Sequence, residues 1–255
     1  MRTNDVDSVP RAEVTASERS VTSADNGHAE LPTPTASYSD TTRPYLELPG
    51  AEDQLLSFRY VRPWFGSLPV LDLGCAKGAY LRQFALGSFG VDVSRPNLEH
   101  CRGLGLRVMA ADLNRQLSFS SESFPAILCS HVLEHVDAPI NLLRECHRIL
   151  KPEGLLVLGL PIESNLVNWL RGHKYFYHHP GHLYSFSLEN INVLLQKTGF
   201  DIVRFYLEPR IVRFQLWLSV MQRLPVGAMY PLALAYWVVA RKTHSLIETE
   251  EFRSE

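Results

Sequence analysis

The sequence predicts an α/β fold built on a doubly wound, mostly parallel β-sheet. Three observations favour it: short β-rich runs alternate with helical stretches, loops with Gly and Pro separate them, and no internal repeat is visible. The chain has 255 residues, of which 45% are hydrophobic, and this is ample for one main domain with a packed core.

The two ends of the chain are predicted to lie outside this domain. Residues 1–44 are rich in Ser, Thr, Asp, Glu and Pro, so they cannot bury enough surface to offset the entropy of ordering. This segment is therefore predicted to be a disordered N-terminal tail. The main domain is expected over 45–243, and 244–255 form a C-terminal tail. Apolar residues recur at helical spacing from Leu55 to Phe65 and predict a first helix.

Seven strands and four further helices are then predicted in order. The strands are Pro69–Leu73, Gly87–Asp92, Leu106–Ala110, Ala126–Ser130, Leu155–Leu160, Ile202–Leu207 and Ala235–Arg241. The helices are centred near Tyr80–Phe84, Asn97–Gly103, Ile140–Leu150 and Leu188–Lys197. A turn is predicted at Lys151–Gly154, because Pro and Gly favour chain reversal before the fifth strand.

Composition argues against several classes of protein. The 25 Lys and Arg nearly balance the 27 Asp and Glu without a basic block, so nucleic acid is not the expected partner. The four cysteines include no Cys-x-x-Cys pair, which argues against a zinc site or a disulfide framework and fits a reducing cytoplasm. No apolar core of a signal peptide is found near the start. The longest apolar stretch, Val226–Ala240, is shorter than the roughly 20 residues of a spanning helix.

A small-residue loop follows the first predicted strand. Asp72 ends the strand, and the loop consists of Gly74, Cys75, Ala76, Lys77 and Gly78. A ligand can approach the backbone of such a loop, and the N-terminus of a following helix adds partly positive N–H groups. The segment is therefore typical of an adenosine-containing cofactor site. Taken alone, it also suits a dinucleotide or a tight turn without a ligand.

Acidic residues end the next two predicted strands. Asp92 can accept hydrogen bonds from both hydroxyls of a ribose, although it also suits the turn before a helix. Asp112 can accept a hydrogen bond from an adenine amino group while Leu113 packs on the ring. Standing alone, Asp112 would be interpreted as an exposed loop residue.

In this order, the segments resemble the class I S-adenosylmethionine (SAM)-dependent methyltransferases. Within them they resemble the small-molecule enzymes that include the ubiquinone- and menaquinone-biosynthesis methyltransferases. Five segments carry the resemblance: Leu71–Cys75, Gly90–Asp92, Ala111–Asp112, Val132–Val136 and Arg148–Gly154. Ala76 departs from the family, because it stands where the loop usually has its middle glycine. Alanine is small enough that we expect binding to persist.

The resemblance implies SAM as the cofactor and S-adenosylhomocysteine as its product. It also implies a Rossmann-like, seven-stranded sheet whose last strand, near Tyr236–Lys242, is antiparallel. Gly74 and its neighbours would lie against the methionine part, and Ser130 with His131 would line the methyl-transfer side. The cofactor residues that it implies are Asp72, Gly74, Cys75, Ala76, Gly78, Asp92, Val93, Asp112, Leu113 and Ser130.

Two histidines are candidate catalytic bases. Methyl transfer from a sulfonium is an in-line displacement that depends mainly on alignment, and a base is needed only if the acceptor must lose a proton. His131 follows the fourth strand, where acceptor and methyl group should meet, and is the first candidate. His182 follows the fifth strand and is the second candidate.

Two residues that follow His131 in the sequence are expected to have structural roles. Glu134 is expected near a helix start, and His135 is expected to pack or hydrogen-bond beneath the loop. No metal is predicted, because His178, His179 and His182 have no carboxylate at ligand spacing.

An apolar insert is predicted at about 209–232. Residues 211–224 are apolar almost all round, which favours a helix buried on the sheet. The alternatives are a lid over an apolar acceptor, or a helix that docks on a membrane with Arg210, Arg213 and Arg223 near lipid headgroups. The expected location is the cytoplasm, with peripheral membrane contact through 211–224 as the alternative.

The sequence therefore predicts a methyltransferase that acts on an O, N or C atom of a small-molecule or lipid-like acceptor. No protein partner is predicted, and a peptide acceptor stays open. An NAD-dependent oxidoreductase could use a similar loop and acid, but Val132–Val136 and the last strand favour methyl transfer. The alternative from another class is a non-catalytic SAM-binding module with a regulatory or scaffold role.

Overall fold

The computed structural model describes residues 58–163, 181–209 and 233–243, all of which belong to one unit, Ala36–Glu255. Several predictions lie outside the described residues. They are the tail over 1–44, the helix start at Leu55, the histidines His178 and His179, the insert segment 211–224 and the C-terminal tail over 244–255.

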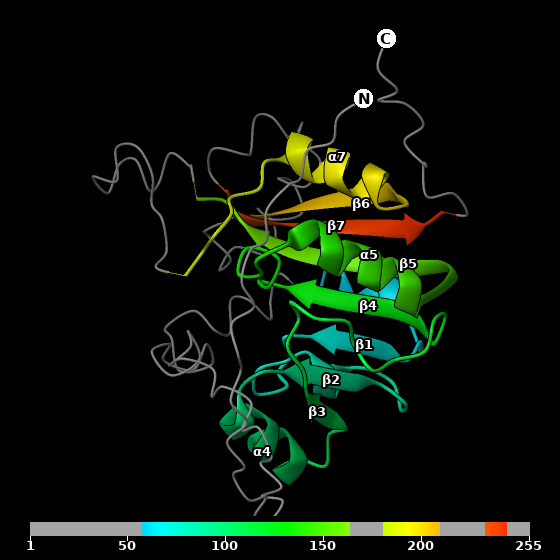
Figure 1. The fold of residues 1–255 in the computed structure, drawn as a ribbon, viewed down its shortest axis with the longest axis vertical. Helices are drawn as coiled ribbons and strands as arrows, with labels where there is room; N and C mark the ends of the chain where they lie inside the picture. The colour runs from blue at the N-terminus through cyan, green and yellow to red at the C-terminus, as the bar shows by residue number, and fades with distance from the viewer. Residues whose placement is uncertain (1–57, 164–180, 210–232, 244–255) are drawn as a thin grey trace, which may run out of the picture. The chain divides into compact units, whose positions relative to one another are not determined.

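A seven-stranded sheet organises the described residues (Figure 1). Its strands are β1 (Val70–Leu73), β2 (Phe89–Asp92), β3 (Val108–Ala110), β4 (Phe124–Ser130), β5 (Leu150–Pro161), β6 (Phe200–Pro209) and β7 (Ala233–Lys242). Their order is β3-β2-β1-β4-β5-β7-β6, and β7 runs antiparallel to both β5 and β6 while the first five strands pair in parallel. The predicted α/β fold with an antiparallel last strand is confirmed.

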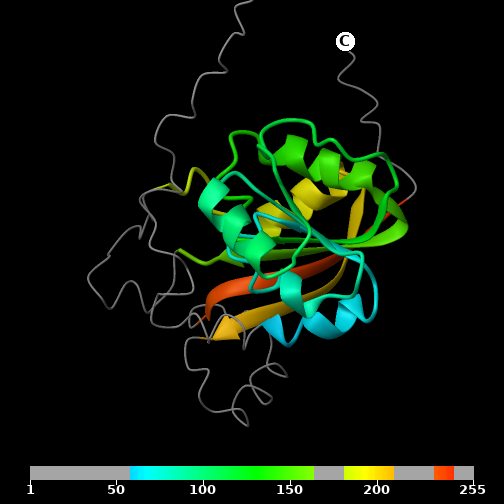
Figure 2. The same ribbon diagram turned by 90° about the horizontal axis from the view of Figure 1, so that it is seen from below.

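Helices cover both faces of the sheet, which is why its central strands are nearly continuous apolar runs. On one face lie α5 (Pro139–Ile149) and α7 (Leu188–Lys197), and on the other lies α3 (Arg62–Phe65) (Figure 2). Leu142, Cys146 and Ile149 recur at helical spacing on α5 and are buried against the sheet. Each such side chain contributes about 1.5–3 kcal/mol when it is fully buried.

The helix α4 (Arg95–Gly103) packs beside the loop after β1. Its Leu98 and Cys101 are buried, and Leu98 belongs to a small apolar cluster with Cys75 and Leu81. Within 58–163, 181–209 and 233–243, no helix has the length and apolar character needed to cross a membrane.

The prediction of an α-helix near Tyr80–Phe84 is wrong. It is a single 3₁₀ turn, η2 (Leu81–Gln83). Phe84 is already extended, and the chain turns at Gly87, where φ is +93°, to enter β2 at Phe89. Too few residues remain for an α-helix, so the expected contribution of an α-helix N-terminus to the loop is also wrong.

Two other local predictions need correction. The first predicted helix is interrupted: among its described residues Phe58 and Arg62–Phe65 are helical, with a turn between them. Pro63 lacks the N–H that a continuous helix would donate four residues back, so the helix cannot run through this point. The turn predicted at Lys151–Gly154 lies within β5, where the pairing with β4 shifts register between Phe124 and Ala126. Glu153 has a φ of +59° there, so the Pro and Gly residues form a bulge.

Candidate functional site

The predicted site residues meet along the carboxyl edge of the parallel strands. Asp72 lies in β1, Asp92 ends β2, and Ser130 ends β4. Asp112 follows β3, and the N–H of its neighbour Ala111 donates to the carbonyl of Asp92 over 3.1 Å. This edge is where doubly wound sheets bind their ligands.

The loop after β1 adopts a left-handed backbone at three positions. Gly74, Ala76 and Gly78 have φ angles of +70°, +44° and +76°. This region costs a non-glycine residue about 1–2 kcal/mol, so Ala76 is strained. A Cβ atom on Gly74 would lie 2.4 Å from Cγ2 of Val132. Glycine is therefore required at position 74, and the loop lies directly against the chain that follows His131.

Asp92 fastens this loop. Its Oδ2 accepts a hydrogen bond from the N–H of Ala76, and its Oδ1 accepts one from the N–H of Ser94, both at 2.8 Å. The side chain is buried. An ionised carboxylate has about four acceptor positions, so two bonds leave room for the hydroxyls of a ribose. The turn role and the ribose role of Asp92 are thus compatible.

Asp72 lies beneath the loop as a buried acid. Its side chain is 1% exposed, and its Oδ2 has no hydrogen-bond partner. Burial, and then the charge of Asp92, raise the pKa of Asp72 well above its usual range. A buried oxygen without a donor is costly, and perturbed acids of this kind gather at functional sites.

The part of the edge predicted to hold adenine has an apolar flank and an exposed acid. Val93 is 50% exposed, and Leu113 is half-buried against the main core. Asp112 is exposed, accepts a hydrogen bond from the N–H of Asn114 at 3.0 Å and pairs with Arg115 at 3.3 Å. Asp112 therefore shapes its own turn while its position beside Asp92 suits adenine.

His131 is held in a strained conformation at the end of β4. Its φ is +54°, and its N–H donates to the carbonyl of Gly159 in β5 at 2.8 Å. Its Nδ1 lies 3.4 Å from Oε1 of Glu134, whose side chain is fully buried. Burial alone lowers the pKa of His131, but Glu134, and more weakly Glu208, outweigh it and raise this pKa above its ordinary value.

Glu134, expected near a helix start, lies in a turn five residues before α5 begins at Pro139, so it is not part of that helix. Its carbonyl accepts hydrogen bonds from the N–H groups of Leu183 at 2.7 Å and Tyr184 at 3.3 Å. Burial alone would raise the pKa of the Glu134 carboxyl, but His131 and then His135 hold it below its ordinary value. The opposite shifts of His131 and Glu134 describe an ion pair.

His182 belongs to a second pair of a histidine with a buried acid. Its Nδ1 lies 2.6 Å from Oε1 of Glu163, and both side chains are buried. His135 stands beside it, with ring centroids 4.7 Å apart and nearly perpendicular planes. The Nδ1 of His135 bonds the carbonyl of Gly181 at 2.8 Å, which matches the structural role expected for it. Burial above all lowers the pKa of His135.

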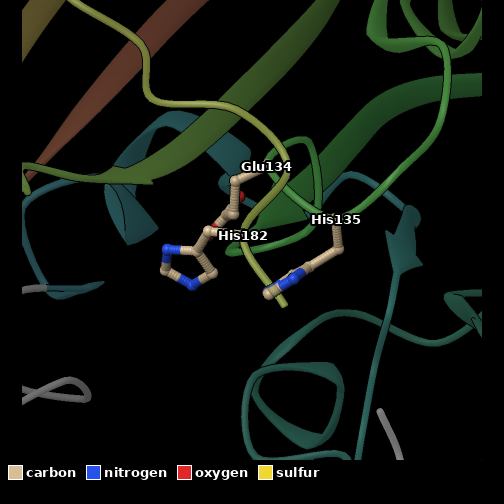
Figure 3. A group of neighbouring side chains, drawn as sticks. All are labelled: Glu134, His135 and His182. Atoms are coloured by element: carbon tan, nitrogen blue, oxygen red, sulfur yellow. The ribbon is translucent and has the colours of Figure 1, made fainter. Parts of the chain in front are cut away.

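One group of metal-type donors occurs among the described residues. Glu134, His135 and His182 each offer one atom, and these atoms lie within 4.8 Å of one another (Figure 3). The argument that His182 lacks a nearby carboxylate is therefore wrong, because the fold brings Glu134 and Glu163 to it. In the structure each of the three has another partner: His131, the Gly181 carbonyl and Glu163. Both carboxylate oxygens of Glu134 are buried without a hydrogen bond among the described residues, and the nearest charged group to them is His131. The absence of a metal stays a prediction.

Two buried acids were missed by the sequence analysis. Glu163 comes two residues after the end of β5, and Glu208 lies near the end of β6. Pro161 and Glu208 are both paired with Ala235 of β7, so the two acids flank the start of that strand. An acid just after a strand was the signal used for Asp92 and Asp112, and it could also have found Glu163.

The edge fits the cofactor that the resemblance implies. Gly74 and Gly78 keep the loop free of bulky side chains, and Asp72 has a buried oxygen without a hydrogen-bond donor. The sulfonium and ammonium groups of SAM are cationic, and the carboxylate of Asp92 supplies a complementary charge. Gly74 through Gly78 would hold the methionine part, and Asp92 would hold the ribose.

Other proteins are similar to this chain in sequence. Residues 59–204 match a family described as a methyltransferase domain. The ubiquinone biosynthesis O-methyltransferase of Histophilus somni (strain 2336) is 33% identical over 101 residues, covering 34% of this chain and 42% of that protein. The chain thus spans about two fifths of the length of this curated relative.

Solved structures share the fold. A SAM-dependent methyltransferase from Archaeoglobus fulgidus has a TM-score of 0.58 at 22% identity, covering 74% of this chain and 94% of that chain. One from Mesorhizobium loti has a TM-score of 0.55 at 19% identity, covering 74% and 98%. The resemblance to class I SAM-dependent methyltransferases is confirmed, and with more than half of its length matched by the methyltransferase domain, the chain belongs to that family.

Proposed function

We propose that this protein transfers the methyl group of SAM to an O, N or C atom of a small-molecule or lipid-like acceptor. One observation carries the proposal. The strained loop that Asp92 fastens lies against Val132, the residue directly after the candidate base His131. A donor held by the loop and an acceptor beside His131 would therefore meet at one short stretch of the sheet edge.

The chain's own residues bind and orient both reactants in this proposal. SAM supplies an activated methyl group when it is bound. Asp92 holds the ribose, Leu113 with Val93 packs on the adenine, and Asp112 accepts from its amino group. Alignment of the reactants is the main source of rate in such a displacement.

The acceptor side is lined by two histidine–acid pairs. His131 and His182 each have Nδ1 beside a buried glutamate, which suits a base that takes a proton from the acceptor. The curated relatives carry the name ubiquinone biosynthesis O-methyltransferase, and this favours transfer to oxygen.

The test uses SAM labelled with ¹³C in its methyl group. The full chain is incubated with labelled SAM and with lipid and aqueous fractions of a cell extract, and the products are examined by carbon NMR. A labelled methoxy carbon in one fraction is expected, and an N-methyl or C-methyl carbon would redirect the assignment to another acceptor atom. Tight SAM binding by calorimetry without any transfer would support the non-catalytic SAM-binding alternative.

A further inference from the structure

We propose that Glu134 is a positioning residue, whose buried carboxylate orients the ring of His131 and stabilises the imidazolium formed when His131 takes the acceptor's proton. This inference rests on the proposed function. It assigns a role in methyl transfer to a residue that the sequence analysis had interpreted as structural.

The first support is the conformation of His131. Its φ of +54° is one that non-glycine residues rarely adopt, and its N–H is bonded to Gly159 of β5. Strain of this kind costs of the order of 1–3 kcal/mol and persists where the surroundings impose it, most often at functional sites. In this position the Nδ1 atom of His131 lies 3.4 Å from Glu134, so Nε2 is the nitrogen assigned to the acceptor in this proposal.

The second support is the burial and anchoring of Glu134. The side chain is completely buried, and the backbone around it is fixed because its carbonyl accepts from both Leu183 and Tyr184. A charge is costly to bury unless it is paired. His131 provides the pairing at 3.4 Å, somewhat longer than the roughly 2.7–2.9 Å of a strong charge-assisted bond. Such contacts are often long in the free enzyme and tighten when reactants bind.

The third support is the electrostatic surroundings of the pair. The charged groups that act on His131 are Glu134 and Glu208, and both His131 and His135 act on Glu134. His182 lies beside Glu134 and His135 (Figure 3), and it pairs with Glu163 at 2.6 Å. Both acids that act on His131 favour its protonated form, so the site stabilises the charge that develops on the base.

For a hydroxyl acceptor, the proposed reaction is a direct displacement at the methyl carbon. The acceptor oxygen forms a bond to the methyl carbon while the carbon–sulfur bond of the sulfonium breaks, and that electron pair stays on sulfur. The hydroxyl proton passes to Nε2 of His131 and later to water. Glu134 keeps its charge throughout, because its part is to hold Nδ1–H and the resulting cation.

The experiment compares Glu134→Gln with a matched surface control. Glutamine has nearly the same shape, so the variant removes charge with little change in packing. Glu189→Gln makes the same change at an exposed position in the first turn of α7. In full-length protein labelled at histidine, NMR follows the titration of His131, whose signal is assigned from a His131→Gly variant. Glycine suits the positive φ at that position.

The expected result has three parts. Glu134→Gln moves the His131 titration to lower pH, because burial then acts without its main opposing charge. It lowers kcat by about 10- to 100-fold, a part of the total contribution of a general base. It leaves the affinity for SAM unchanged by calorimetry. Glu134→Asp restores part of kcat, and added imidazole restores part of the activity of His131→Gly.

Several outcomes would overturn the proposal. Unchanged titration of His131 together with unchanged kcat in Glu134→Gln would leave Glu134 a purely structural residue. A stoichiometric divalent ion in the purified protein, found by elemental analysis and lost in Glu134→Gln, would make it a metal ligand. If Glu134→Gln does not fold, the His131→Gly variant tests the proposal instead. Full activity of that variant without imidazole would show that His131 is not the base. Failure of wild type to bind SAM would instead refute the proposed function.

Discussion

The cofactor half and the acceptor half of the sheet edge are built from different chemical groups. Around β1 and β2, backbone N–H groups of the loop bind the carboxylate of Asp92, and small residues leave the backbone accessible. Around β4 and β5, two imidazoles each have Nδ1 beside a buried glutamate, at 2.6 Å for His182 and Glu163 and at 3.4 Å for His131 and Glu134. A binding site formed by backbone groups requires a particular loop conformation, so few substitutions are tolerated there. Pairs of side chains can be replaced when the acceptor differs.

Gly74→Ala should have the largest effect on the cofactor half. The new Cβ would lie 2.4 Å from Cγ2 of Val132 in a backbone with a φ of +70°. Overpacking costs about 1–3 kcal/mol and the left-handed backbone about 1–2 kcal/mol more. We expect lower stability by denaturant titration and loss of SAM binding by calorimetry. Adding Val132→Ala should recover only the stability lost through overpacking. Full recovery of stability would show that the left-handed backbone at position 74 is not required.

Asp92→Asn should weaken SAM binding by about 10- to 100-fold, as expected for hydrogen bonds to a charged group. The amide can accept from only one of the two N–H groups of Ala76 and Ser94, so the loop loses an anchor. Calorimetry measures the change, and Asp201→Asn on the exposed edge strand β6 is the control. Equal affinities for SAM in the two variants would remove Asp92 from the site.

Glu163→Gln should act on turnover rather than on SAM. It replaces the carboxylate at 2.6 Å from His182 with a neutral group, so the ring is held less firmly. We expect kcat to fall about tenfold, the equivalent of one hydrogen bond, with unchanged SAM affinity. A change in SAM affinity without a change in kcat would break the division of the edge into two halves.

Asp72→Asn should change the dependence of stability on pH. The folded-state pKa of Asp72 is raised, first by burial and then by Asp92, so its contribution to stability is present below the unfolded pKa and lost as pH rises through the folded one. The asparagine variant has no carboxyl group to ionise, so its stability does not fall in this way as pH rises. Its free energy of unfolding relative to wild type should therefore increase with pH above the acidic range. Parallel pH curves for the two proteins would contradict the raised pKa.

Ala76→Gly should have the smallest effect. Relief of the left-handed strain at a φ of +44° gains about 1–2 kcal/mol, and the greater freedom of glycine in the unfolded chain costs about 0.4–1 kcal/mol. We expect a net stabilisation of about 0.5–1 kcal/mol by thermal denaturation and no loss of SAM affinity. A destabilised variant would mean that the methyl group of Ala76 makes a contact worth more than the strain.

The fold and the cofactor half could be predicted because their signals are local. Apolar runs identify strands, and parallel strands bring their ends to one edge, so Asp92 and Asp112 were placed from sequence order alone. The predicted strands agree with the observed ones to within a few residues at each end. The helix after the loop was missed because the length available before β2 depends on where the chain turns at Gly87.

The sequence by itself determined the alternating strands and helices of the sheet and the order of the predicted cofactor residues, because these follow from hydrophobic periodicity and residue type at strand ends. The antiparallel last strand was expected from the resemblance to known methyltransferases, and its pairing with β5 and β6 is seen in the structure. Only the tertiary structure decided which acid meets which histidine. Glu163 and His182 are 19 positions apart, and the turn that holds Glu134 is fixed by backbone bonds to Leu183 and Tyr184. Such pairs depend on how loops from separate strands dock against each other, and no local pattern encodes that docking.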